Sequence, residues 1–216
     1  MSGRTAVKPQ QQDTRAYHLR ELQLALDSTD PKHCNPPPIA PEQRVLDIGC
    51  GAGQTLIAAC PGRLSFGLDI NLEALRLGRT LTKKVAFVCS SAEETPFGAA
   101  SFDVILARVS LPYSNLYRSL KEIRRLLRPG GYAWMVLHPF GVPWAAARKA
   151  NWKGWLFFLY IVVNSICFHL TGRMVPFVDG RHESFQTVSG MRRALRKAGF
   201  REISVAKGAH FVVSAS

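Results

Sequence analysis

The chain carries the stretch Val45-Leu-Asp47-Ile-Gly49-Cys-Gly51-Ala-Gly53, in which a short apolar run leads into three alternating glycines. Such a run predicts a buried strand, and the glycines predict a tight loop that opens a helix. Glycine adopts positive φ and has no Cβ, so a ligand can approach the backbone closely there. Backbone N–H groups at the amino end of a helix also favour a polar ligand. We therefore expect a ligand-binding loop at residues 49–53, the alternative being a tight turn without a ligand.

Two phosphate-binding motifs do not fit this loop. A P-loop ends in Gly-Lys followed by Ser or Thr, whereas this loop continues as Gln54-Thr55. The dinucleotide fingerprint needs its third glycine one residue further on, where Gln54 stands. Asp47, two residues before the first glycine, would repel a pyrophosphate and attract a positively charged group. The loop therefore favours a ligand that carries a cationic arm in place of phosphate.

Asp69 supplies a second carboxylate, at the end of the next expected strand and twenty residues after Gly49. In α/β nucleotide sites, this position holds the acid that accepts hydrogen bonds from ribose hydroxyls. An aspartate there is also a common helix N-cap, which is the structural alternative. A nucleoside with a cationic, non-phosphate arm has the chemistry of S-adenosylmethionine, so the two acids together favour that cofactor.

The rest of the chain alternates strands with helices. Strands are expected at 44–48, 64–70, 85–89, 101–107 and 132–138, and helices at 14–27, 53–60, 71–83, 115–128 and 187–198. Residues 200–206 and 209–215 predict an antiparallel hairpin at the sheet edge. The alternation predicts an α/β fold, a Rossmann-like doubly wound sheet of about seven strands, mostly parallel with right-handed crossovers.

Three segments fall outside this alternation: residues 1–13, 30–41 and 139–185. Residues 1–13 are polar and are expected to be a disordered tail. Residues 30–41 hold five prolines and predict a stiff, extended connector. We therefore divide the chain into residues 1–41, a tail, helix and connector, and residues 42–216, one domain with an apolar insert at 139–185.

Four segments at this spacing resemble the class I S-adenosylmethionine-dependent methyltransferases, in particular the small-molecule type. They are 45–53, 67–70, 90–97 followed by 101–104, and 126–131. The resemblance covers roughly residues 42–138. It implies that Gly49, Gly51 and Gly53 pack against the methionine arm, that Asp47 lies beneath it, that Asp69 binds the ribose, that Ile70 lies beside the adenine, and that Ala92 and Glu93 line the adenine edge.

Three of the implied roles have an open alternative. Ser91 stands where such sequences often have an aspartate for the adenine amino group; its hydroxyl can still accept that hydrogen bond, more weakly than a carboxylate. Glu93 also fits a solvated loop acid. Arg108 follows the fourth strand, where the resemblance places residues that face the transferred methyl group, and it also fits a solvent-facing position.

The resemblance implies methyl transfer by in-line displacement, which depends on alignment and on exclusion of water. A general base is needed only where the acceptor must lose a proton. The candidates are Tyr113, His138 at the carboxyl end of the fifth strand, and His182 beside Glu183; each also fits a structural or surface role. Tyr17 and His18 on the first helix are candidates for covering the cofactor, or belong to an ordinary amphipathic helix.

The insert at 139–185 is the expected substrate determinant. Its stretch 155–170 is apolar and aromatic, and at sixteen residues it falls short of the roughly 20 that span a bilayer. We expect a buried lid helix, with membrane-surface contact through residues 148–173 or a homodimer interface as alternatives. An apolar lid predicts a small hydrophobic acceptor such as a lipid, quinone, terpenoid or polyketide.

The net charge is +13 and the isoelectric point is near 10.0. Residues 141–216 carry eleven basic and three acidic residues, a net charge of +8. Such a field favours anionic partners. RNA base methylation is therefore an alternative function, although aromatic stacking platforms are not interleaved with the basic helices. A catalytically inactive cofactor-binding partner or membrane-surface module is another.

The five cysteines are scattered and form no C-x-x-C pair, so neither a disulfide framework nor a metal site is expected. They are interpreted as reduced thiols of a cytoplasmic protein, with a location peripheral to the membrane as the alternative. The first twelve residues are polar and do not resemble a Sec signal peptide. With 47% apolar residues, the composition excludes disorder, collagen and a multi-span membrane protein.

Overall fold

The structure is a computed structural model. It describes residues 10–30, 32–60, 62, 64–137, 141–148, 151–177, 182–208 and 210–216, except for the side chains of residues 10–13, 142 and 146. The strands are β1 (Val45–Ile48), β2 (Ser65–Asp69), β3 (Val85–Cys89), β4 (Phe102–Arg108), β5 (Leu127–Leu137), β6 (Ile203–Lys207) and β7 (Phe211–Ala215). The helices are α1 (Gln10–Leu26), α2 (Gln54–Ala59), α3 (Leu72–Leu81), the 3-10 helix η1 (Leu111–Tyr113), α4 (Leu116–Leu126), α5 (Gly141–Ala147), α6 (Trp152–Thr171) and α7 (Val188–Ala198).

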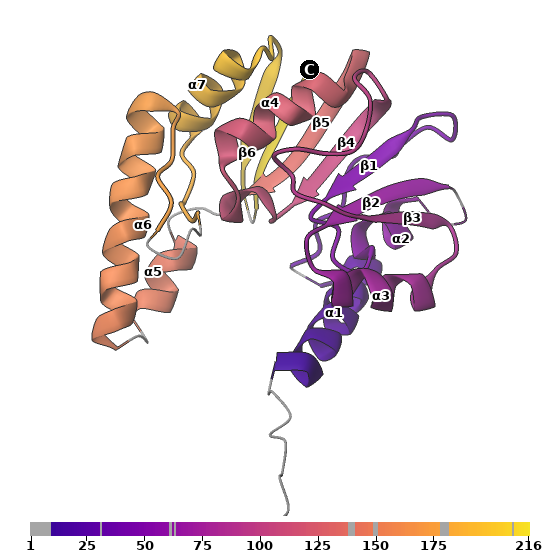
Figure 1. Ribbon diagram of the computed structural model, residues 1–216, viewed down its shortest axis with the longest axis horizontal. Helices are drawn as coiled ribbons and strands as arrows, with labels where there is room; N and C mark the ends of the chain where they lie inside the picture. Colours follow the sequence, from indigo (N-terminus) through magenta and orange to yellow (C-terminus); the bar gives the residue numbers. More distant parts are fainter. Residues whose placement is uncertain are drawn as a thin grey trace, which may run out of the picture.

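The strands form one sheet in the order β3-β2-β1-β4-β5-β7-β6 (Figure 1). The strands β1 to β5 pair in parallel, and β7 pairs antiparallel with both β5 and β6. The predicted α/β sheet with an antiparallel hairpin at its carboxyl-terminal edge is therefore confirmed. Leu137 pairs with Phe211, so the turn between β6 and β7 lies at the edge where the parallel strands end.

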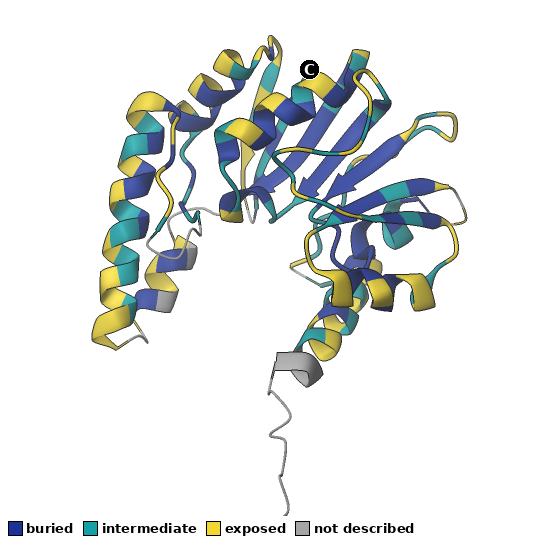
Figure 2. Cartoon of the chain, viewed as in Figure 1, coloured by how far each residue is buried: buried dark blue, intermediate teal, exposed yellow. Residues whose placement is uncertain are grey.

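Helices cover both faces of the sheet. Leu120 and Ile123 of α4 and Leu195 of α7 pack against one face, where Phe168 of α6 joins them. Leu56 of α2 and Leu75 of α3 pack against the other face. The central strands are consequently buried on both sides, which accounts for their continuous apolar sequence (Figure 2).

One predicted boundary is wrong. The helix expected at 115–128 ends at Leu126, and residues 127–131, expected to end a helix, already belong to β5. Leu127 pairs with Phe102, and the guanidinium of Arg128 lies 3.2 Å from the Asp103 carboxylate. These contacts to β4 replace the next helical turn, which Pro129 would have interrupted in any case.

The amino-terminal segment also differs from expectation. Helix α1 begins at Gln10, so residues 10–13, expected in a disordered tail, are helical. The side chains of His33 and Asn35 hydrogen-bond to carbonyls near the end of α1, at Leu24 and Ala25. No helix or strand occurs among the described residues between Asp27 and Arg44, where a proline-rich connector is expected.

The insert forms two helices: α6 lies beside α7 at the side of the sheet, and α5 packs against α6 (Figure 1). Asn151 caps α6 by accepting from Gly154 N, and Gly172 ends it in the left-handed conformation at φ 72°. The helix therefore has 20 residues, more than the apolar stretch 155–170. Its length and apolar composition are sufficient for a helix that crosses a membrane. The expectation from residues 155–170 alone was a helix too short to do so.

Candidate cofactor site

A cavity of about 630 Å³ lies at the carboxyl ends of the central strands, against α1. It brings together nine of the predicted site residues: Gly49, Gly51, Asp69, Ile70, Ser91, Ala92, Glu93, Arg108 and Tyr113. Asp47 and Gly53 do not line the cavity but lie next to residues that do. This position at the carboxyl edge of β1, β2 and β4 is where ligands bind in doubly wound sheets.

The glycine loop folds as its sequence predicts. Gly49, Gly51 and Gly53 all have positive φ, at 73°, 55° and 85°. A Cβ on Gly49 would lie 2.1 Å from Ser110 Cβ, and one on Gly51 would lie 2.8 Å from His18 Cε1. Side chains at these positions would therefore collide with β4's following loop and with α1. The glycines are needed both for the turn and for close packing around the cavity.

Asp47 is fully enclosed at the end of β1, and its Oδ1 has no hydrogen-bond partner. Burial raises the pKa of this carboxyl to about 8, with Arg108 acting to lower it and Asp69 acting to raise it. An unpaired buried carboxyl is costly, and a cationic ligand group nearby would favour its charged form. The position therefore fits the amino and sulfonium charges of S-adenosylmethionine.

Asp69 holds the loop and the start of α3 together. Its Oδ2 accepts from Gly51 N at 2.8 Å, and its Oδ1 accepts from Asn71 N at 2.8 Å. The N-cap of α3 is Asn71, whose side chain accepts from Glu73 N and Ala74 N, so the N-cap alternative for Asp69 is wrong. Each carboxylate oxygen retains further lone pairs for a ligand.

Helix α1 forms one wall of the cavity through Tyr17, His18 and Glu21. Gln54 Nε2 donates to His18 Nδ1 at 2.8 Å, and burial lowers the pKa of this imidazole below its usual value. Arg108 is not solvent-facing: its Nη1 lies 3.2 Å from Glu21 Oε2, and both side chains are mostly buried. Since the two partners lie 87 positions apart, the pair cannot be inferred from local pattern.

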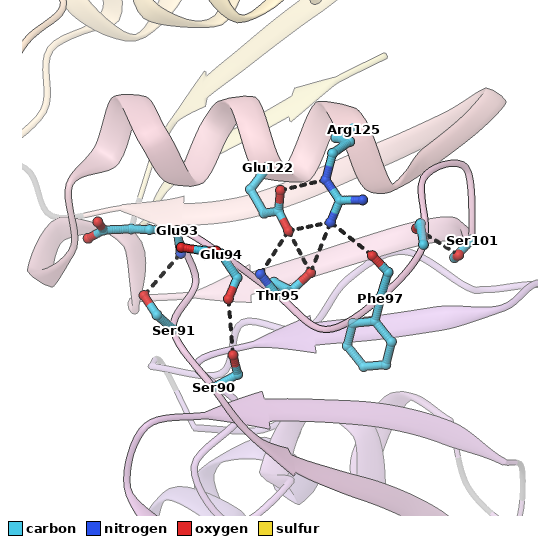
Figure 3. Close-up of polar contacts among 10 residues, drawn as sticks. Ser90, Ser91, Glu93, Glu94, Thr95, Phe97, Ser101, Glu122 and Arg125 are labelled. Carbon is cyan, nitrogen blue, oxygen red and sulfur yellow. Dashed lines mark hydrogen bonds and ion pairs between the residues drawn. The ribbon is translucent and has the colours of Figure 1, made fainter.

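The segment 90–97 is anchored to α4 by a polar network (Figure 3). Glu122 Oε1 accepts from both Thr95 N, at 2.8 Å, and Thr95 Oγ1, at 2.6 Å. Arg125 donates to both carboxylate oxygens of Glu122 and to Phe97 O. Burial by itself would raise the pKa of Glu122, but these hydrogen bonds hold it at about 2. The anchored segment carries Ser91, Ala92 and Glu93 into the cavity wall.

Ser91 and Glu93 already have protein partners. Ser91 Oγ accepts from Glu93 N at 3.2 Å. Glu93 Oε1 accepts from Asn115 N at 2.8 Å, and Arg118 lies 3.8 Å from its other oxygen. Glu93 is therefore held at the start of α4 and is not a freely solvated loop acid. The hydroxyl of Ser91 retains acceptor capacity for an adenine edge.

The three catalytic candidates differ in their position relative to the cavity. Tyr113 lines the cavity; burial, together with nearby Glu183 and Tyr17, raises its pKa to about 12. His182 does not line the cavity, and its Nε2 is buried without a partner. His138 lies outside the described residues. Among the described residues 141–148 and 151–177, none lines the cavity, so the lid role of the insert stays a prediction.

Sequence reasoning missed His210. This residue lies in the turn between β6 and β7, lines the cavity, and has a buried Nε2 without a partner. The signal was available indirectly: the predicted edge hairpin places its turn at the carboxyl ends of the parallel strands. An imidazole facing a ligand cavity at this edge is a candidate for proton transfer.

Comparisons with known proteins agree with this geometry. Residues 46–135 match the methyltransferase domain family. A relative from Synechocystis, named as an uncharacterized methyltransferase, is 34% identical over 122 residues, covering 54% of this chain and 53% of the relative. A demethylmenaquinone methyltransferase from Chlorobaculum tepidum is 28% identical over 166 residues, covering 74% and 66%.

The fold is also similar to that of solved methyltransferase structures. The crystal structure of an S-adenosylmethionine-dependent methyltransferase from Thermotoga maritima superimposes with a TM-score of 0.55 at 19% identity, covering 94% of this chain and 90% of that one. The chain spans about half to two thirds of the length of the first curated relatives that it matches. The glycine loop, the buried acid beneath it, the family match over residues 46–135 and the shared fold all point to the class I S-adenosylmethionine-dependent methyltransferases that the sequence resembles.

Proposed function

We propose that the protein transfers a methyl group from S-adenosylmethionine to a small apolar acceptor. The observation that carries the proposal is the cavity itself, whose lining combines the glycine loop and Asp69 with Tyr113, Val136 and His210. The loop and the acids fit the cofactor. Tyr113 and His210 supply two proton-carrying side chains for an acceptor in the same cavity.

Bound S-adenosylmethionine supplies a methyl group on a positively charged sulfur, ready for displacement by a nucleophile. The chain's own residues bind and orient it. Gly49 and Gly51 allow the methionine arm to approach the backbone, and Asp47 lies beneath it. Asp69 binds the ribose hydroxyls, with Ile70 beside the adenine. Alignment of donor and acceptor, with water kept away, is the main contribution that such a reaction needs.

The remaining proposed cofactor contacts come from two loops. Ser91, Ala92 and Glu93 line the adenine edge, where the network around Glu122 holds them. Arg108 faces the methyl position from the end of β4, and its ion pair with Glu21 ties α1 to that position. Helix α1 is therefore needed to close one side of the cavity.

Proton transfer is assigned to His210. Because the pKa of Tyr113 is about 12, its phenol stays protonated at neutral pH and acts as a hydrogen-bond donor to the acceptor. His210 has an open ring nitrogen and accepts a proton where the acceptor is a hydroxyl or an acidic carbon. We expect His210→Gln to lower kcat with little change in cofactor affinity, and Tyr113→Phe to raise KM for the acceptor.

The apolar class of acceptor has two supports. The relative from Chlorobaculum tepidum is named for demethylmenaquinone, a quinone. Helix α6 exposes an apolar surface. In the chain it follows α5 and β5, and β5 ends at the sheet edge where the cavity lies. Incubating the protein with labelled S-adenosylmethionine and fractionated cell extract tests this class. Label in the lipid-soluble fraction supports it, and label confined to RNA or to water-soluble products contradicts it.

The cofactor site has a separate test. Replacing Asp69 with alanine removes the acceptor for both ribose hydroxyls and the partner of Gly51 N. We expect cofactor binding, measured by titration calorimetry, to weaken by about a hundredfold, equivalent to two lost charge-assisted hydrogen bonds. Asp27→Ala, at an exposed aspartate bonded only to its neighbour Thr29, is the matched control and should bind normally. Normal binding by Asp69→Ala would contradict the site.

A further inference from the structure

Helix α6 buries two polar side chains of its middle turns. Asn164 and Ser165 are almost fully buried. Asn164 Oδ1 accepts from Val175 N at 2.8 Å, and its Nδ2 donates to Glu183 O at 3.0 Å. Ser165 Oγ accepts from Phe185 N at 3.0 Å. The polar groups of this helix are therefore used to hold the segment that returns from α6 to α7.

The opposite side of α6 is apolar. Between Gly154 and Leu170, every exposed residue of the helix is apolar. We define the apolar face as Trp152, Trp155, Leu156, Leu159, Val163, Ile166 and Leu170, each between 45% and 71% exposed. At 100° per residue these positions fall within about 100° of the helix circumference. Figure 2 shows this exposed side turned away from the sheet and from α7.

Tryptophan extends this surface at one end. Trp144 of α5 is exposed, and its ring lies 6.2 Å from that of Trp155 and 5.8 Å from that of Phe158. Tryptophan favours the boundary between hydrocarbon and water, where its ring is buried and its N–H is hydrated. The end of the apolar face near α5 thus has the composition of an interfacial anchor.

Cations lie at both ends of the apolar face. Arg148 and Lys153 are exposed at its amino end, and Arg173 is exposed at its carboxyl end. Arg193 and Lys197 of α7 also lie there: Arg193 donates to His169 O and Leu170 O, and Lys197 donates to Thr171 O. Residues 141–178 contain no Asp or Glu. Every charged side chain of residues 141–178 is therefore basic.

We propose that the apolar face docks on an anionic lipid bilayer, with α6 lying in the plane of the membrane surface. An apolar side that sinks among acyl chains, flanked by cations that meet lipid phosphates, is the pattern of interfacial helices. A second copy of the chain fits less well, because pairing two such faces would bring cations together without an acid to oppose them. The proposal is independent of which acceptor is methylated.

Vesicle binding by the full chain tests the proposal. We expect sedimentation with vesicles of phosphatidylcholine and about one third phosphatidylglycerol, and weak or no sedimentation with phosphatidylcholine alone. Brominated acyl chains should quench tryptophan fluorescence from the α5–α6 region. Trp134, only 4% exposed within the sheet, supplies an unquenched background. Replacing Trp144, Trp152 and Trp155 by phenylalanine should abolish the quenching.

A charge placed in the apolar face makes the test specific. Leu159→Glu with Val163→Glu should weaken vesicle binding more than tenfold, while cofactor affinity is unchanged. Leu64→Glu is the matched control, because Leu64 is a similarly exposed leucine at the start of β2, away from α6. Arg173→Gln should weaken binding to anionic vesicles by about fivefold.

Three results would overturn the proposal. They are absence of binding to anionic vesicles, binding that survives Leu159→Glu with Val163→Glu, and a dimer in analytical ultracentrifugation that this double variant dissociates while vesicles bind neither form. Cofactor binding in the same preparations separates this outcome from the proposed function. A protein that binds S-adenosylmethionine but no vesicles contradicts the docking alone.

Discussion

The cofactor cavity and helix α6 differ in whether their buried polar side chains have hydrogen-bond partners in the protein. At the cavity, Asp47 Oδ1 and His210 Nε2 are buried without a protein partner. In α6, Asn164 and Ser165 are equally buried, but each is bonded to backbone of the returning segment. Buried polar atoms without partners are costly. At the cavity a ligand can supply the missing partners, whereas in α6 the protein itself supplies the partners of Asn164 and Ser165.

The exposed surfaces differ in the same way. The cavity wall exposes acids, hydroxyls and imidazoles to a polar ligand. The outward side of α6 exposes tryptophan, leucine, valine and isoleucine to the surroundings. Contiguous apolar surface on a folded protein indicates a contact with another apolar phase or partner. One end of the molecule is thus organised for a charged nucleoside, and the other for a hydrophobic environment.

The largest effect is expected from Gly49→Ala, which breaks the cavity without touching α6. The new Cβ would overlap Ser110 Cβ, and the backbone φ of 73° is strained for alanine. We expect about 3 kcal/mol lower stability in urea unfolding and at least hundredfold weaker cofactor binding. Gly130→Ala, with φ 79° and open space, should lose only about 1 kcal/mol. Equal losses would show that packing at the loop is unimportant.

Asn164→Leu tests the inward side of α6. It removes the acceptor of Val175 N–H and the donor to Glu183 C=O, so we expect the free energy of unfolding to fall by about 3 kcal/mol. Leu156→Asn, on the apolar face, makes the reverse change and should stay within about 0.5 kcal/mol. In a surface helix with its polar side outward, replacing the asparagine would have little effect and replacing the leucine would destabilise the fold. Chemical denaturation of both variants decides between the arrangements.

Glu122→Gln weakens the anchor of segment 90–97. The folded pKa of about 2 lies below the ordinary carboxyl value of 4.5, so the ionised form stabilises the fold above pH 4.5. That stabilisation is lost as pH falls toward 2. Because Arg125 is partly exposed, we expect a deficit of about 2 kcal/mol at pH 7. The deficit should shrink in acid denaturation below pH 4.5, and Glu94→Gln, at an exposed neighbour, should show none.

The smallest effect is expected from pH acting through Asp47. With a pKa of about 8, this carboxyl must lose its proton before it favours a cation, so cofactor affinity should rise about tenfold between pH 7 and pH 9 relative to Asp47→Asn. The comparison with the variant is needed because the cofactor's own α-amino group titrates in this range. Titration calorimetry at each pH measures the ratio. A constant ratio would place the cation elsewhere.

Stability provides the converse test of Asp47. Its folded pKa lies above its ordinary value, so the unliganded fold loses stability as pH rises from about 4 toward about 8. Asp47→Asn should therefore unfold at higher denaturant concentration than the parent protein at pH 8, while binding the cofactor less well. A variant that is both less stable and a weaker binder would contradict the unpaired state of the carboxyl.

Much of the cofactor end could be predicted from the sequence because its signals are local. The glycine loop occupies consecutive residues, and a strand and helix of ordinary length fix the distance from Gly49 to Asp69. Arg108 was placed correctly at the end of β4, but its partner Glu21 was not, because the pair depends on how α1 docks. His210 was missed for a different reason, because the predicted hairpin did not show which residue beside its turn reaches the cavity.

By itself, the sequence determined the α/β class, the sheet edge at which the site lies and the residues of the glycine loop, because these follow from periodicity and short-range spacing. It also determined that residues 155–170 are apolar. Only the tertiary structure decided which side of α6 faces outward, because Asn164 and Ser165 find backbone partners in residues 175–185. Those long-range hydrogen bonds turn the polar side inward and leave an apolar face exposed, which periodicity alone would have assigned to the core.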